Sequence, residues 1–280
     1  MKFLHKALAL AAFAMTTYAF PDQSNAQSMP ICPTSGTATQ ADMANYPEGC
    51  RGTPTRYVIS IYEMGLCTAN PIASGSYDPS SCVPTLISSG GQSVNLAGGA
   101  SINLSSGSGG ERPENGTYPY AYIHIGNTFG LNGSYELCGL AACGDGAGGG
   151  TWYSDGQDPD VAPGGDNADN TLAAGVDFVD VLTTFGPSNG PCTTTAYENV
   201  GGGRLDALLV DTNLTPSCTG AAKIIGSFAP STPITIDDTV TGIDVGFTVT
   251  NNGMSISPAN DGTIMSFLSG PFNPIFTILN

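Results

Sequence analysis

The residues of this sequence best suited to chemistry are aspartates gathered in one glycine-rich stretch. Ca²⁺ takes about six to eight hard oxygen ligands in flexible geometry, and a loop rich in Asp, Asn and Gly can supply both carboxylates and carbonyls. The spacing fits neither the EF-hand loop nor the nonapeptide calcium repeat. We therefore hypothesise a Ca²⁺ site, with a solvated acidic loop as the alternative. The candidate ligands are Asp145, Asp155, Asp158, Asp160, Asp166 and Asp169.

Hydrolytic chemistry has one candidate base, His124, because His5 falls in the amino-terminal leader. His124 alternates with tyrosines along an apolar run, a pattern more typical of a packed sheet face than of a catalytic group. The sequence contains neither an H-E-x-x-H motif nor a phosphate-binding loop. A pair of carboxylates, as in glycosidases, stays open because any two acids can meet in space. We expect a protein that is not an enzyme, with a secreted hydrolase as a less favoured alternative.

The eight cysteines indicate a disulfide framework rather than a metal site. An even number of cysteines in an exported chain is typical of paired thiols. No C-x-x-C pair occurs, which disfavours zinc. We predict sequential pairing, in which each bond closes a short loop and restricts the unfolded chain. The expected bonds are Cys32 to Cys50, Cys67 to Cys82, Cys138 to Cys143, and Cys192 to Cys218.

The first 26 residues have the layout of a secretory signal peptide. A short basic start precedes the uncharged apolar run 7–20, and a polar tail ends with small residues at Ala26. No later segment is long and apolar enough to be predicted as a membrane span. We therefore expect a secreted or cell-surface location, and the short alanine-rich leader suggests a bacterial source.

Composition narrows the class of partner. The chain carries 23 Asp and Glu against 7 Lys and Arg, for a formal net charge of −16. A nucleic-acid binder needs a basic face for phosphates, so this class is excluded. The expected partner is another copy of the chain or an extracellular surface ligand.

Short apolar runs separated by turn residues predict an all-β, mainly antiparallel fold of disulfide-stapled β-sandwich type. We expect a polar lead-in at 27–55, two sandwich-like units at 56–140 and 171–280, and a Gly/Asp-rich loop at 141–170. At most one short helix is expected, and residues 171–185 favour it slightly over a strand because both helix caps are present. The predicted strands are 56–62, 83–88, 93–96, 101–104, 117–125, 131–137, 194–200, 204–211, 222–228, 234–236, 243–250, 254–256, 264–268 and 275–279.

The carboxyl-terminal end is unusually apolar for so polar a chain. An apolar end must be buried, either as the last strand of its own sandwich or by insertion into a neighbouring subunit. The first function predicted is accordingly a structural or adhesive extracellular protein, as a self-assembling subunit of a surface appendage or filament. The alternative is a Ca²⁺-dependent carbohydrate- or surface-binding module. The candidate assembly residues are Phe272, Ile275, Phe276, Ile278 and Leu279.

Overall fold

The computed structural model describes residues 29–104, 109–139, 149–159, 166–185, 193–200 and 203–280. The predicted leader lies outside these residues.

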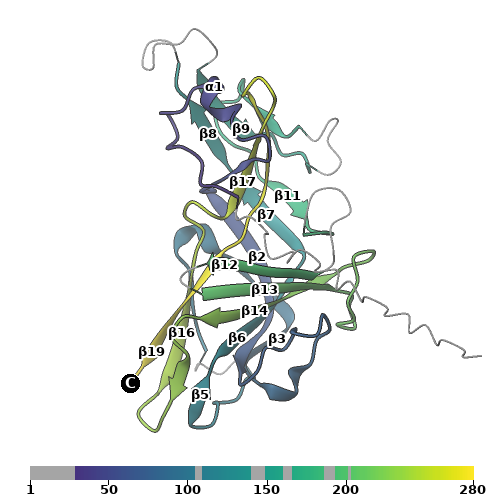
Figure 1. Ribbon diagram of the computed structural model, residues 1–280, viewed down its shortest axis with the longest axis vertical. Helices are drawn as coiled ribbons and strands as arrows, with labels where there is room; N and C mark the ends of the chain where they lie inside the picture. Colours follow the sequence, from purple (N-terminus) through teal and green to yellow (C-terminus); the bar gives the residue numbers. More distant parts are fainter. Residues whose placement is uncertain (1–28, 105–108, 140–148, 160–165, 186–192, 201–202) are drawn as a thin grey trace, which may run out of the picture.

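The all-β prediction is confirmed: every ladder between the named strands is antiparallel, and the described residues contain one short α-helix, α1 (Gln40–Met43). The elements are shown in Figure 1. The strands are β1 (Cys50–Gly52), β2 (Arg56–Cys67), β3 (Cys82–Asn95), β4 (Ser101–Asn103), β5 (Gly116–Tyr118), β6 (Tyr120–Gly126), β7 (Thr128–Asn132), β8 (Ser134–Leu137), β9 (Gly150–Ser154), β10 (Ala168–Asp169), β11 (Phe178–Val181), β12 (Thr193–Val200), β13 (Gly203–Val210), β14 (Lys223–Pro230), β15 (Ile234–Ile236), β16 (Gly242–Thr248), β17 (Met254–Pro258), β18 (Ile264–Ser269) and β19 (Asn273–Leu279).

The largest sheet is organised around β2, which pairs along both of its edges. On one edge β2 pairs with β3, and on the other its first residues pair with β7 and its later residues with β6. The sheet continues from β6 through β14 and β13 to β12, and from β7 to β11. It curls into a half-barrel. Strands of the two predicted units, 56–140 and 171–280, are therefore interleaved in one sheet.

Two residues divide strands that the sequence predicted as continuous. Pro119 has no N–H for a ladder, so the predicted strand 117–125 divides into β5, which pairs with β15, and β6. Gly133 divides the run 131–137 into β7 and β8. A Cβ at this position would overlap the flexible end of the Met254 side chain, so a larger residue would require that side chain to shift.

Smaller sheets cover the two ends of the half-barrel. β1, β17 and β18 form one three-stranded sheet, and β8, β9 and β10 form another. In Figure 1 these lie toward the top with α1, whereas β16 and β19 project at the lower left. β16 pairs with β19 on one edge and with the short β4 on the other.

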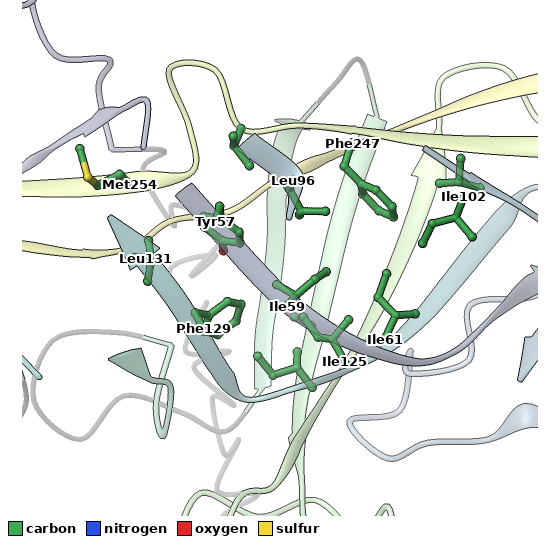
Figure 2. Close-up of a cluster of buried hydrophobic side chains, with 14 of the residues drawn as sticks. Tyr57, Ile59, Ile61, Leu96, Ile102, Ile125, Phe129, Leu131, Phe247 and Met254 are labelled. Carbon is green, nitrogen blue, oxygen red and sulfur yellow. The ribbon is translucent and has the colours of Figure 1, made fainter. Parts of the chain in front are cut away.

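The hydrophobic core runs through the concave side of the half-barrel. Alternate residues of β2, Tyr57, Ile59 and Ile61, point into it and are at most 1% exposed. Figure 2 shows them packed with side chains from other elements, among them Ile125 of β6 and Phe247 of β16. A core drawn from strands this distant in sequence ties the elements into one cluster of buried side chains.

The helix expected at 171–185 is wrong, because the segment contains the strand β11, paired with β7. Asp180 is a charged residue within the apolar alternation of this strand. In the structure Asp180 is 3% exposed, and its carboxylate accepts a hydrogen bond of 2.6 Å from the Ser269 amide. The buried charge is thus compensated by a partner far away in the chain.

Two of the predicted disulfides are confirmed, Cys32–Cys50 and Cys67–Cys82. Cys138 and Cys218 are also disulfide-bonded. Cys143 and Cys192 lie outside the described residues, so the pairings Cys138 to Cys143 and Cys192 to Cys218 stay predictions.

The Cys67–Cys82 bond joins the end of β2 to the start of β3 and closes a loop with a sequence separation of 15. Replacing both cysteines by alanine should lower the free energy of unfolding by about 3 kcal/mol, because the unfolded chain is no longer constrained. Urea denaturation measures this loss. Equal midpoints for the variant and the wild-type protein would show that the bond contributes nothing to stability.

Candidate functional site

The concave face of the half-barrel bounds a cavity of about 1360 Å³. Its floor is formed by inward-facing residues of adjacent strands: Ala121 and Ile123 of β6, Leu205 of β13, and Gly226 and Phe228 of β14. Every second residue of a strand points to the same face of the sheet, and on these strands the residues that face the cavity are apolar. The structure therefore contains a large apolar hollow in addition to its packed core.

The chain just before and within β19 forms another wall of the cavity. Phe272 packs edge-on against Phe247, with 5.6 Å between ring centroids, and against Tyr57 at 6.1 Å. Phe276 stacks on Phe228 at 5.9 Å. These two candidate assembly residues are thus directed at the chain's own core.

Two buried polar groups of the cavity are hydrogen-bonded within the protein. The Tyr57 hydroxyl donates a 2.6 Å hydrogen bond to the Gly270 carbonyl, and the Asp180 carboxylate accepts from Ser269. Burial, with a smaller effect of the Asp180 charge, raises the pKa of Tyr57 well above its usual value. The described residues that line the cavity include no Lys, Arg or His. The site is therefore suited to an uncharged apolar ligand.

His124 lies on the opposite, convex face beneath the loop closed by Cys67–Cys82. It is 3% exposed, and the Tyr77 ring of that loop packs edge-on against it at 4.8 Å. The neighbouring Tyr122 hydroxyl donates a 2.6 Å hydrogen bond to Glu63. His124 is therefore packed within a sheet face in the structure.

Burial, assisted by the nearby positive charge of Lys223, lowers the pKa of His124 to about 4. Its Nε2 atom is buried and has no hydrogen-bond partner within the described structure, as is also true of the Ser227 hydroxyl. Protonation would therefore place a poorly compensated charge in the protein interior.

This environment predicts acid lability. In the unfolded chain His124 titrates near its ordinary pKa of 6.5, so between pH 6.5 and 4 the unfolded state binds more protons. The stability contributed by the neutral imidazole is present above pH 6.5 and falls by about 3 kcal/mol as the pH approaches 4. His124→Phe should flatten this part of the profile. Urea denaturation at pH 7 and pH 4.5 tests it, and identical pH dependence in both proteins would contradict the assignment.

The predicted calcium ligands are only partly within the described residues, because Asp145 and Asp160 fall outside them. Asp155 accepts a 2.8 Å hydrogen bond from the Gln157 amide, and Asp169 accepts one of 2.7 Å from the Thr171 amide. Hydrogen bonds from Thr171 lower the pKa of Asp169. No three acidic, histidine or cysteine side chains gather into a metal-binding group within the described part of the chain. The Ca²⁺ site stays a prediction.

The calcium hypothesis predicts that millimolar Ca²⁺ raises the melting temperature, because a ligand bound only by the folded state stabilises it. Asp158→Ala and Asp166→Ala should each abolish the rise. Asp261→Ala is a matched control, since that exposed carboxylate lies in another loop, where it accepts a hydrogen bond from the Thr263 amide. A wild-type melting curve that is the same in Ca²⁺ and in chelator would refute the hypothesis.

The other assembly candidates lie on β19, which pairs with β16 along its whole length. This is the pairing expected of a strand that closes its own domain. Ile275 is nevertheless 53% exposed, the largest exposed fraction among the large exposed hydrophobic residues of the described chain. β19 is also at the end of its sheet, in the order β19, β16, β4. One edge of the strand is thus available for pairing within the described structure.

Ala121, Ile123 and Ile125 share one face of β6, but a face of one strand does not indicate a cavity. The alternation of β6 was the available signal. The curvature that turns this face into a hollow depends on which strands pair with β6, and this information is not local.

Comparison of the chain with protein-family models, with curated proteins and with solved structures finds no match. The fold and the sites therefore define the protein only as an antiparallel β-protein with disulfide bonds. Those bonds indicate an oxidising compartment. None of the helices in the described residues has the length and apolar character needed to cross a membrane.

Proposed function

We propose that this chain is a secreted structural protein whose copies associate through β19. The observation that carries the proposal is the combination of an edge position with an apolar, uncharged sequence. No charged residue occurs between positions 263 and 280, although the whole chain has a formal net charge of −16. Natural edge strands are normally protected by charges, bulges or covering elements. Apart from Pro274 near its start, β19 has no such protection among the described residues.

A second copy of the chain fits this edge better than a charged partner does. Two molecules with net charge −16 repel each other, so close approach is least costly where both surfaces are uncharged. Antiparallel pairing of two β19 strands centred on Thr277 would place Ile275 opposite Leu279 and Phe276 opposite Ile278. Such apolar cross-strand pairs stabilise antiparallel sheets. The association would add main-chain hydrogen bonds between copies.

This self-association makes the protein a building unit of an extracellular surface structure. A twofold β19 contact by itself gives a closed dimer, and a filament requires a second contact between dimers. The predicted signal peptide and the disulfides support the extracellular setting. No specific observation on the described residues favours calcium-dependent surface binding or hydrolysis instead.

The test is the molecular mass of the purified oxidised protein over a range of concentrations, by light scattering and sedimentation. The wild-type protein should associate, and Ile275→Lys should shift it to monomer because each β19 edge would then carry a charge. Added salt should strengthen wild-type association by screening the repulsion between copies.

Ile87→Lys provides a matched control, because Ile87 is 42% exposed and lies on β3, another strand of the large sheet. This variant should associate like the wild-type protein. Association that survives Ile275→Lys, or a wild-type protein that stays monomeric at millimolar concentration and high salt, would refute the proposal. Electron microscopy distinguishes closed dimers from filaments.

A further inference from the structure

We propose that the apolar cavity is a binding site for an uncharged long-chain lipid. The inference is independent of self-association through β19, because it depends on the concave face of the half-barrel rather than on the open edge. Four properties of the site support it: its size, its extent, the incomplete burial of part of its apolar lining, and the absence of positive charge among its described lining residues.

The size exceeds what a small polar ligand requires. The cavity measures about 1360 Å³, whereas most small-molecule sites measure about 300–1,000 Å³. Packed protein interiors contain few voids larger than a water molecule. A cavity of this volume beside a well-buried core is large enough for a long apolar molecule.

The cavity also extends over a long part of the molecule. Its lining includes Ser257 of β17 and Leu268 of β18, and at the other end Phe228 of β14 and Phe276 of β19. Of these elements, β17, β14 and β19 are labelled at successive heights along the long axis in Figure 1. A site lined by residues from elements at different heights of the molecule suits an extended hydrocarbon chain better than a compact ring-shaped ligand.

Part of the apolar lining is still incompletely buried. Ile123, Leu205, Leu182 and Phe272 line the cavity and are only half-buried, in contrast to the core residues beside them. Covering such side chains with hydrocarbon removes apolar surface from water, at about 25 cal/mol per Å². The hydrophobic effect thus supplies a driving force for binding.

Charge determines the kind of lipid. Glu48 and Asp180 are the acidic residues of the lining, and its described residues include no cation that could pair with a fatty-acid carboxylate or a phosphate. The net charge of −16 further disfavours an anion. An uncharged head group, such as that of a long-chain alcohol, avoids both costs.

The experiment uses N-phenyl-1-naphthylamine, an uncharged apolar dye whose fluorescence rises on leaving water, with the purified full mature protein. We expect saturable binding of the dye and its displacement by 1-hexadecanol. Hexadecanoate at pH 8 should displace it at least about tenfold less effectively, a difference of about 1.4 kcal/mol. Absence of dye binding, or equal displacement by the alcohol and the carboxylate, would overturn the proposal.

Leu205→Trp tests the location, because the larger side chain occupies space on the cavity floor. Dye binding should weaken at least about tenfold, whereas Ile87→Trp, which places the same ring on an exposed position of β3, should leave it unchanged. Unchanged binding by a folded Leu205→Trp protein would place the dye elsewhere and contradict the assignment. If that variant does not fold, Ile123→Trp replaces it, and the displacement series with the wild-type protein decides the proposal on its own.

Discussion

The pairing of β2 along both edges is the constraint on which the rest of the structure depends. One continuous strand holds β3 on one side and both β6 and β7 on the other. β6 and β7 pair with different parts of β2. On its other edge β6 pairs with β14, and β7 pairs with β11. The sheet built on these pairings curls into a half-barrel, and its inward residues Tyr57, Ile59 and Ile61 form the centre of the core (Figure 2).

That curvature has two consequences for function. On the concave side, the inward faces of β6, β13 and β14 line a large apolar cavity next to the packed core. At the periphery, the sheet of β4, β16 and β19 leaves the last strand at an edge. Phe276 of β19 stacks on Phe228 at the cavity wall, so the two features share a side chain, although their proposed roles depend on different surfaces. Ile275, the exposed neighbour, does not line the cavity.

Much of the fold could be predicted from the sequence because it depends on local patterns. Period-two alternation located most strands, and the short loops between neighbouring cysteines indicated the bonds Cys32–Cys50 and Cys67–Cys82. The failures have non-local causes. Asp180 made a strand at 178–181 look unfavourable, yet the Ser269 amide satisfies its carboxylate across a separation of 89 residues. Likewise, Pro119 and Gly133 are visible as breaks, but the direction the chain takes after each depends on distant partners such as β15 and Met254. The candidate site could be predicted only as a face of β6, because a cavity requires the curvature of the whole sheet.

The proposed contact between copies of the chain lies at the outer edge of β19. Hydrogen exchange of the carboxyl-terminal segment, followed by mass spectrometry at low and high protein concentration, measures this edge directly. Main-chain amides that face water in the monomer should become protected when two edges pair. Protection of residues 273–280 should rise with concentration while that of β3 stays constant. Exchange in residues 273–280 that is independent of concentration, in a sample shown to be associated, would contradict it.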